Sequence, residues 1–351
     1  LTTTPSPPLA GSYTLPGDKS LAHRAALFAA LAEGESVIGS YPLSGVTRAM
    51  LDALTAFGVP WSASDGTLTV RGAGLRGLRP PAAAVDCRNS ATTIRLLAGA
   101  AAAAGVPCIL DGSAGLRRRP MDRFTAPLRA MGVAIGAAPG GGAPLTLAER
   151  PAGTPLAAGG HVLPVASAQV KSCLLLAALA AGGPVTVVEP GPSRDHTERM
   201  LAAMGVEVRR DTRAHRVTLV PPAAPLRPLR TELAGDISTA AFLMVAAACI
   251  PGSDITLRGA GVNPTRTGLI DALRAMGADI AVPPPRDRSG EPVADVRVRA
   301  APLRGIRVAG DLVVRMIDEF PVFAVAAAAA SGVTEVRGAG ELRHKESDRI
   351  G

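Results

Sequence analysis

Short polar segments recur along the chain, each directly before an Ala/Leu-rich stretch, and their residue types suit the binding of an anion. Residues 16–20 read PGDKS and are followed at once by the apolar stretch 21–31. A turn that ends in Lys19 and Ser20 at a helix N-terminus offers backbone N–H groups, a hydroxyl and an ammonium to an anion. The spacing of a Walker loop is absent. The alternatives are therefore a different kind of anion site or an ordinary helix cap with a solvated lysine.

Three more segments have the same placement. Residues 89–93 read NSATT, residues 116–121 read LRRRPM, and residues 165–171 read VASAQVK, with Ser167 and Gln169 as small hydrogen-bonding groups. Arginine binds a carboxylate or phosphate through two parallel hydrogen bonds, and serine and glutamine suit a polyol or a phosphate. At least one of the three arginines is expected to be a solvated spectator.

Acidic segments complete the set. Residues 193–198 (SRDHTE) open a helix, although their acids could simply stabilise its dipole, and His196 is expected to be structural. Residues 318–321 (DEFP) and 341–349 (ELRHKESDR) place acids beside bases. The second run could instead be a solvated, salt-bridged helix start. Because all these segments occupy helix N-termini, we expect them to converge on one cleft that attracts anions.

An internal repeat indicates which elements must position these segments. The phrases LTAFGV, LRAMGV, LAAMGV and LRAMGA place glycines at spacings of 74, 73 and 72 residues: Gly58, Gly132, Gly205 and Gly277. Each phrase predicts the end of an amphipathic helix, with glycine after the cap, and then an alternating strand. Ala/Leu-rich helices stopped by glycine are predicted between them, at 24–34, 94–105, 170–182, 239–252 and 322–332. A helix–strand–helix–strand unit of about 73 residues is thus used at least four times.

The composition bounds the class of protein. With 351 residues, 47% hydrophobic and 19% charged, the chain is too apolar for a disordered or fibrous protein and long enough for two domains. Its net charge of +8 suggests anionic partners. Of the 37 basic residues 34 are arginines. We interpret a retained lysine as a need for a compact ammonium, and the three are Lys19, Lys171 and Lys345.

Nothing in the sequence favours a metal centre, a disulfide framework or a membrane anchor. The cysteines are widely scattered and form no CxxC pair: Cys87, Cys108, Cys173 and Cys249. The longest apolar runs are interrupted and shorter than the roughly 20 residues that span a bilayer. Residues 1–8 do not resemble a secretory signal. These features favour the reducing cytoplasm.

Taken together, the motifs resemble those of the 5-enolpyruvylshikimate-3-phosphate synthases, or 3-phosphoshikimate 1-carboxyvinyltransferases. The resemblance rests on segments that follow in order along essentially the whole chain: PGDKSLAHR, residues 89–95, RRRPM, PVASAQVK, SRDHTE, GDISTAAF, NPTRTG, DEFP and ELRHKESDRI. It implies an α/β fold, a two-domain inside-out α/β barrel with three of the counted repeats in each domain. Six repeats need about 438 residues, so the resemblance implies that the chain continues past Gly351 and leaves the activity of the 351-residue chain in doubt.

The resemblance also implies a domain division and a reaction. Residues 17–234 would form a domain that binds shikimate-3-phosphate, and residues 1–16 plus 235–351 would form the second, with hinges near 15–17 and 234–235. The enzyme would transfer the enolpyruvyl group of phosphoenolpyruvate to the 5-hydroxyl of shikimate-3-phosphate and release phosphate, as a step in chorismate and aromatic amino-acid biosynthesis. It would need no metal or organic cofactor, bind no nucleic acid or membrane, and act as a monomer in the cytoplasm.

Site residues follow from the resemblance, position by position. The resemblance assigns these residues to shikimate-3-phosphate: Lys19, Ser20, Arg24, Ser167, Ala168, Gln169, Ser193, Asp318 and Lys345. It assigns these to phosphoenolpyruvate: Lys19, Ala91, Arg119, Gln169 and Arg349. Catalysis would fall to Lys19, to Asp318 as the base for the 5-hydroxyl, and to Glu346 as the proton donor to the methylene carbon.

Departures from the family pattern have consequences of their own. Arg88 and Ala91 stand where the family commonly has glycine, Ala168 replaces a frequent serine, and Leu96 a frequent proline. Arg88 is expected to bring a bulky cation near the phosphoenolpyruvate pocket. The methyl group of Ala91 is expected to make the enzyme tolerant of glyphosate, which resembles phosphoenolpyruvate but is longer.

Three other readings stay open. The sister enolpyruvyl transferase, which acts on UDP-N-acetylglucosamine, has the same architecture, but its mobile loop usually bears a cysteine and residues 111–121 have none. A nucleic-acid-binding repeat protein would use exposed aromatic side chains, and only 3% of this chain is aromatic. A catalytically inactive scaffold is the third.

Overall fold

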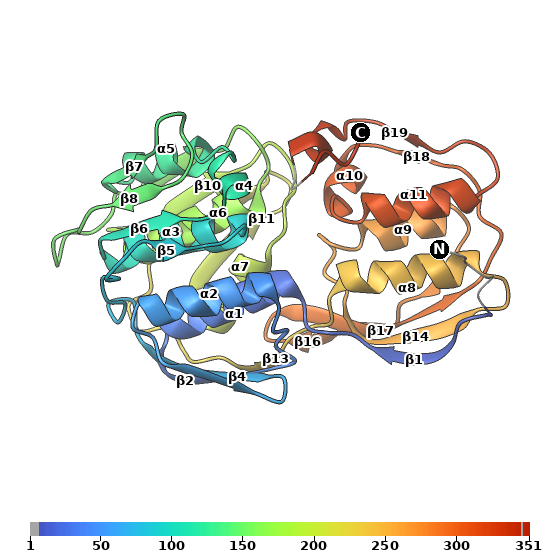
Figure 1. The fold of residues 1–351 in the computed structure, drawn as a ribbon, viewed down its shortest axis with the longest axis horizontal. Coiled ribbons are helices and arrows are strands. Elements are labelled where there is room, and N and C mark those ends of the chain that lie inside the picture. Colours follow the sequence, from blue (N-terminus) through green and yellow to red (C-terminus); the bar gives the residue numbers. More distant parts are fainter. Residues whose placement is uncertain (1–6, 345–346) are drawn as a thin grey trace. The chain divides into compact units, whose positions relative to one another are not determined.

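The computed structural model describes residues 7–344 and 347–351, so that Lys345 and Glu346 lie outside the described residues. The chain divides into two compact units (Figure 1). Unit 1 comprises residues 1–18 and 234–351, and unit 2 comprises residues 19–233. The chain thus crosses between units after Asp18 and after Leu233, where the domain boundaries expected from the sequence lay after residues 16 and 234.

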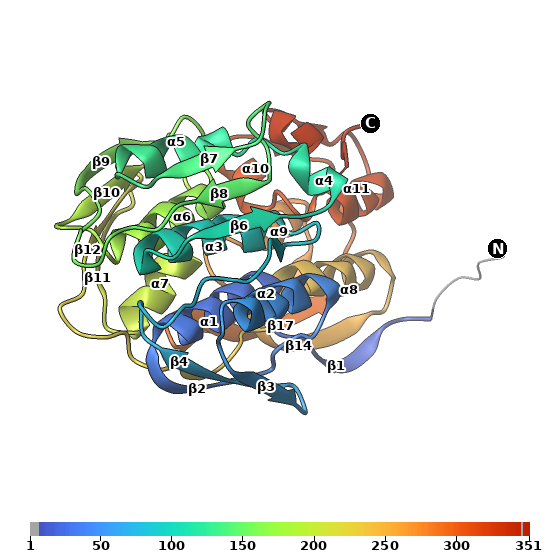
Figure 2. The same ribbon diagram turned by 60° about the vertical axis from the view of Figure 1, so that its left-hand side comes forward.

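Unit 2 contains three four-stranded sheets that share one pairing pattern (Figure 2). In each sheet a short edge strand runs parallel to a central strand, and a hairpin of two strands continues the sheet antiparallel. The first sheet has the order β13 (Arg230–Glu232), β2 (Glu33–Gly39), β4 (Thr67–Ala73) and β3 (Trp61–Ser64). The second has β5 (Val85–Asp86), β6 (Cys108–Asp111), β8 (Leu145–Leu147) and β7 (Ile135–Ala137). The third has β9 (Gly159–Val162), β10 (Val185–Val188), β12 (Arg216–Val220) and β11 (Glu207–Asp211).

Each sheet of unit 2 is accompanied by two main helices of different character. The first kind is buried nearly all round: α1 (Lys19–Leu31), α3 (Ala91–Ala104) and α6 (Ala168–Ala178). The second kind buries one face: α2 (Gly45–Ala56), α5 (Asp122–Ala130) and α7 (His196–Ala203), while α4 (Ala114–Arg117) is a single turn. A helix that is apolar on every side belongs in a core. The Ala/Leu-rich composition therefore explains why α1, α3 and α6 fill the interior of unit 2.

Unit 1 repeats the same design. Its sheet has the order β1 (Ala10–Thr14), β14 (Asp254–Gly261), β17 (Glu291–Arg299) and β15 (Asp279–Ala281), with β16 (Arg286–Arg288) also paired to β17. Its helices are α8 (Ile237–Cys249), α9 (Gly268–Ala275), α10 (Asp311–Arg315) and α11 (Phe320–Ala329). A second, two-stranded sheet joins β18 (Arg307–Val308) and β19 (Glu335–Val336), and the 3₁₀-helix η1 spans Gly340–His344. Figure 1 shows β1, β14 and β17 side by side beneath α8.

The two crossings exchange edge strands between repeats. β1 precedes α1 in the chain but pairs with β14 of unit 1, whereas β13 precedes α8 but pairs with β2 of unit 2. The crossing segments also bond to each other: the Asp18 amide donates to Ala234 O (2.8 Å), and the Asp236 amide donates to Pro16 O (2.9 Å). The sheet of unit 1 is therefore completed by the segment before the first crossing, and the first sheet of unit 2 by the segment just before the second.

The glycine repeat is confirmed in detail. Gly58, Gly132, Gly205 and Gly277 follow the C-caps of α2, α5, α7 and α9, and all four have positive φ, between 77° and 103°. Only glycine adopts this left-handed conformation without a steric penalty. The predicted unit was wrong in its strand count, because it omitted the second hairpin strand and the edge strand. The Pro/Gly-containing segment 283–292 includes β16 and the start of β17.

The predicted α/β class is confirmed, with separate sheets and no closed barrel among the described strands. Within the described residues, no helix is both long and apolar enough to cross a membrane. α3 and α6 pack closely in unit 2 (Figure 2), and a Cβ atom added to Gly99 would lie 2.3 Å from Cys173 O on α6. The close approach of these two helices therefore depends on glycine at this position.

We predict that Gly99→Ala lowers the free energy of unfolding by about 1–3 kcal/mol, because overpacking forces the two helix backbones apart. The matched control is Gly45→Ala, since Gly45 also lies in a helix and an added Cβ would meet nothing within 4 Å. Urea denaturation of both variants checks this. Equal stability of the two variants would show that α3 and α6 can separate at no cost.

Candidate functional site

The N-termini of α3 and α6 are joined by Gln169. Its Nε2 donates to Thr92 Oγ1 at 2.8 Å, and its Oε1 accepts from Arg95 Nη1 at 2.5 Å. Burial, together with the charges of Arg119 and Arg123, lowers the pKa of Arg95 to about 10. None of the ion pairs found among the described residues includes Arg95. Positive charge is thus concentrated beside Gln169.

The first turn of α3 keeps donors available beside this charge. Ser90 caps the helix, with its Oγ accepting from the Thr93 amide at 3.1 Å. Ala91 is the first helical residue and is buried, at 5% exposure. Among the described residues, no protein acceptor bonds the amides of Ala91 or Thr92. Backbone N–H groups of this kind are the usual ligands of an anion at a helix N-terminus.

Arg24 fixes the start of α1 against α6 and α7. Its Nε donates to Thr197 Oγ1 (2.8 Å), its Nη2 to Ser172 Oγ (3.0 Å) and its Nη1 to Ser20 O (3.0 Å). The side chain is only 3% exposed. A guanidinium held on three sides presents its charge in one orientation, and this orientation places it next to Ser20.

Ser167 and Ser193 lie at the start of α6 and just before α7. Ser167 is the N-cap of α6, and its Oγ accepts from the Val170 amide. One carboxylate, that of Glu189, accepts from the Ser167 amide at 2.8 Å and from Ser193 Oγ at 2.7 Å. Ala168 begins α6 and is partly exposed. The structure therefore brings the expected residues of α1, α6 and the segment before α7 into one connected network.

Two arginines of the basic segment 116–121 differ in exposure and partners. Arg117 is exposed and forms a two-bond pair with Asp111, with Nη2–Oδ2 at 2.5 Å and Nε–Oδ1 at 2.9 Å. Arg119 is half-buried, and its amide donates to Leu116 O. Arg117 is thus exposed and paired with Asp111, and the expectation of a spectator among the three arginines stays a prediction.

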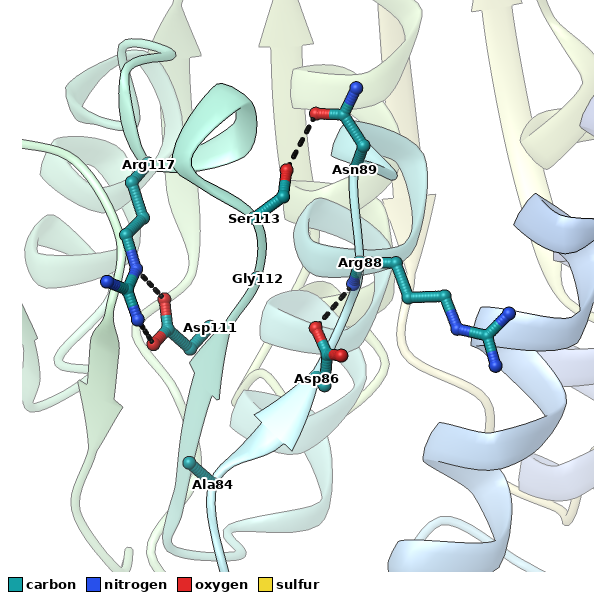
Figure 3. Close-up of a pocket in the computed structure, with 8 residues that line it drawn as sticks. All are labelled: Ala84, Asp86, Arg88, Asn89, Asp111, Gly112, Ser113 and Arg117. Atoms are coloured by element: carbon teal, nitrogen blue, oxygen red, sulfur yellow. Dashed lines mark hydrogen bonds and ion pairs between the residues drawn. The ribbon is translucent and has the colours of Figure 1, made fainter.

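Arg88 directs its side chain towards α2. Its φ of 52° is left-handed, which explains why glycine suits this position. Its side chain leaves towards α2, where Nη2 pairs with Asp52 at 2.6 Å and Nη1 donates to Gly45 O at 3.2 Å. Arg88 is one of the residues that line a pocket of about 650 Å³. Figure 3 shows its side chain pointing away from Asp111 and Arg117. Asp52 thus holds the charge of Arg88 beside α2, and the expectation that Arg88 brings a cation near the phosphoenolpyruvate pocket stays a prediction.

Unit 1 contributes Asp318 and Arg349. Arg349 Nη1 lies 3.4 Å from Asp318 Oδ1, just before α11. The neighbouring Glu319 is buried near Arg266, whose Nη1 pairs with Asp18 Oδ2 at 3.1 Å. Arg266 thereby ties the crossing segment at Asp18 to the turn that carries Asp318. Lys345 and Glu346 fall outside the described residues.

Comparison with known proteins agrees with this arrangement. The family model of EPSP synthase (3-phosphoshikimate 1-carboxyvinyltransferase) matches residues 3–351. The chain is 49% identical to a 3-phosphoshikimate 1-carboxyvinyltransferase of Methylococcus capsulatus, covering 97% of this chain and 77% of that protein. One of Alkalilimnicola ehrlichii is 50% identical over 99% of this chain and 76% of its own. The chain belongs to the EPSP synthase family.

A solved structure supports the fold of this family member. An EPSP synthase structure from Acinetobacter baumannii matches with a TM-score of 0.88 and 42% identity, covering 99% of this chain and 77% of that chain. The resemblance drawn from the motifs is therefore confirmed, both in family and in fold.

Several polar residues around the EPSP synthase motifs were missed as members of the site. Glu189, Ser172 and Thr197 bond directly to the expected ligands. The available signal was positional: Glu189 directly follows the apolar strand β10, at the strand end that faces a helix start. Within the described residues, no group of three or more His, Cys, Asp or Glu side chains is arranged to hold a metal ion.

His23 joins α1 to the start of α2 and makes stability depend on pH. Its Nδ1 lies 2.7 Å from Lys19 O and its Nε2 lies 3.1 Å from Val46 O. Burial lowers its pKa from 6.5 to about 4. Between these values the unfolded chain binds a proton that the folded chain rejects, so stability is complete above pH 6.5 and falls towards pH 4.

We predict a loss of up to about 3 kcal/mol in the free energy of unfolding from this one group across that range. His23→Gln should flatten the dependence between pH 4 and 6.5, whatever its effect on overall stability. His215→Gln, on the turn between β11 and β12, is the control that keeps the slope. Denaturation curves at five pH values measure it, and an unchanged slope in His23→Gln would exclude His23 as the source.

Proposed function

We propose that this chain transfers the enolpyruvyl group of phosphoenolpyruvate to the 5-hydroxyl of shikimate-3-phosphate, with release of phosphate. The observation that carries the proposal is the family match across residues 3–351 together with the gathering of the family's motifs at helix N-termini. Both substrates are polyanions, which suits those helix ends and the net charge of +8.

Unit 2 is proposed to bind shikimate-3-phosphate. Its ligands would be residues of the connected network described above: Ser20, Arg24, Ser167, Ala168, Gln169 and Ser193. Lys19, Asp318 and Lys345 would complete the set. The buried Arg24 supplies fixed positive charge, and the first turn of α6 supplies amides for a phosphate oxygen.

Phosphoenolpyruvate is proposed to bind at the start of α3 and the basic segment 116–121. Its ligands would be Lys19, Ala91, Arg119, Gln169 and Arg349. The amides of Ala91 and Thr92 and the cation of Arg95 beside Gln169 support this placement. Gln169 would serve both substrates, because it lies at the junction of the two helix starts.

Proton transfer would complete the reaction. Asp318 takes the proton from the 5-hydroxyl as the hydroxyl oxygen bonds to C2 of phosphoenolpyruvate. Glu346 delivers a proton to the methylene carbon in the same step. The tetrahedral adduct then loses phosphate from C2 and a proton from the methyl group. General acid–base steps of this kind supply about 10²–10⁴-fold each, and holding the two substrates together supplies roughly 7–11 kcal/mol. Lys19 would balance the negative charge of the reacting groups.

We further propose a cytoplasmic monomer that needs no metal or organic cofactor and binds no nucleic acid. The main competing function is the sister transferase acting on UDP-N-acetylglucosamine. The segment from Asp111 to Met121 argues against that function, because it contains no cysteine. It comprises the end of β6 and α4.

Product formation tests the function directly. We expect phosphate release from phosphoenolpyruvate by the full chain only when shikimate-3-phosphate is present, because the 5-hydroxyl is the nucleophile. UDP-N-acetylglucosamine should give no release. Phosphate release in the presence of UDP-N-acetylglucosamine, or in the absence of both acceptors, would refute the assignment.

Ala91 is proposed to cause tolerance of glyphosate. Its methyl group is buried at the first residue of α3, where a ligand would approach the backbone. Forcing a longer ligand against one extra carbon typically costs about 1–3 kcal/mol, or about 5- to 150-fold in affinity. We therefore predict that Ala91→Gly strengthens glyphosate inhibition by about that factor, while the KM for phosphoenolpyruvate changes little.

Competitive inhibition against phosphoenolpyruvate measures this change. The matched control is Ala168→Gly, the same substitution at the first residue of α6, which should leave glyphosate inhibition as in the parent. Tight inhibition of the parent, or no gain in Ala91→Gly, would show that the methyl group is not the barrier.

A further inference from the structure

The carboxylate of Glu189 is buried between two expected substrate ligands. Its Oε1 accepts from the Ser167 amide at 2.8 Å, and its Oε2 accepts from Ser193 Oγ at 2.7 Å. The Oε2 atom also lies 2.9 Å from Lys171 Nζ. Glu189 is 5% exposed, so that three donors, rather than water, satisfy this charge.

Lys171 lies in the same buried cluster, one turn into α6. Its Nζ lies 2.9 Å from Glu189 and 2.8 Å from Glu198 Oε1, and its side chain is 4% exposed. Burial alone would lower the pKa of Lys171, but the carboxylates of Glu198 and Glu189 together raise it above its ordinary value. The ammonium therefore stays charged and neutralises a carboxylate that would otherwise face the anion site unopposed.

We propose that Glu189 is a positioning residue for shikimate-3-phosphate, held in place by Lys171. This inference rests on the proposed function, in which Ser167 and Ser193 contact that substrate. The Ser167 bond fixes the N-cap of α6, and with it the direction of the first-turn amides. The Ser193 bond fixes a hydroxyl on the segment before α7. One carboxylate thus sets the distance between the two serines.

The geometry also gives a role to Lys171, which alone of the three lysines in this arginine-rich chain had no expected role. A compact ammonium with three donors fits between Glu189 and Glu198. A planar guanidinium presents its donors in a rigid fork that suits a single carboxylate. Glu198 shares Lys171 but is not among the groups that bond Ser167 or Ser193. Glu189 can therefore position the two serines, whereas Glu198 can stabilise the fold only through Lys171.

Glu189→Gln tests the proposal, because a carboxamide offers only one acceptor oxygen. Whichever way the amide turns, its NH₂ faces a group that can only donate, either the Ser167 amide or, beside Ser193, the Lys171 ammonium. We expect the Kd and KM for shikimate-3-phosphate to rise about tenfold, the effect of one lost hydrogen bond of about 1.4 kcal/mol. The KM for phosphoenolpyruvate should change less than about twofold, since neither serine belongs to its proposed ligands.

The matched control is Glu198→Gln, which removes the same charge from the same lysine without touching a serine. It should lower the melting temperature comparably but leave the affinity for shikimate-3-phosphate within about twofold of the parent. Titration calorimetry with shikimate-3-phosphate and thermal melts of the full chain give both readouts. Equal loss of affinity in the two variants, or parent affinity in Glu189→Gln, would overturn the inference.

Glu189→Asp covers the case in which Glu189→Gln does not fold. It keeps the charge opposite Lys171 but withdraws the oxygens from the two serines, so affinity for shikimate-3-phosphate should again fall; unchanged affinity would overturn the proposal. Binding of shikimate-3-phosphate to the parent shows whether the proposed function or only the positioning role has failed. A parent that binds no shikimate-3-phosphate refutes the proposed function, whereas a parent that binds it beside an unaffected Glu189→Gln refutes only the positioning role.

Discussion

Unit 2 is filled by helices instead of a sheet, and each helix that is buried along its length must still satisfy the amides of its first turn. α1, α3 and α6 occupy equivalent places in three copies of one repeat, so their first turns present similar groups to one another. Ser90 and Ser167 satisfy part of this demand from within the chain. The remaining amides carry the positive ends of the helix dipoles. The need to satisfy them is what makes the interior of this unit suited to phosphate and carboxylate groups.

Buried bonds between repeats then decide where the side chains stand. Arg24 reaches α6 and α7, Gln169 reaches α3, and Glu189 holds the start of α6 to the segment before α7. Removing one partner of a buried charge typically costs about 3–5 kcal/mol, so these side chains have little freedom to move. In unit 1, Arg266 is the buried charge that joins separate segments. It pairs with Asp18 at the crossing and lies near Glu319, the neighbour of Asp318. Within each unit, buried bonds of this kind hold polar side chains in place.

The features that the sequence predicted are those with a local signal. Glycines at C′ positions need positive φ, and all four repeat glycines have it. The all-apolar helices and the α/β class follow from periodicity in the same way. Strands such as β5, Val85–Asp86, are too short to show alternation. The contacts of Arg88 and Glu189 join residues 36 and 22 positions apart, and no local pattern reports which distant partner a side chain will find.

Amide chemical shifts of the full chain, followed by NMR while shikimate-3-phosphate is added, test the central claim most directly. If helix N-termini form the site, the first-turn amides of α1 and α6 and the amide of Ser193 shift first. Later addition of phosphoenolpyruvate then shifts the amides of Ala91 and Thr92. Amides on the exposed hairpin turn at Asp65 and Gly66 stay in place. Shifts confined to strands, or none in the first turns of these helices, would contradict the account.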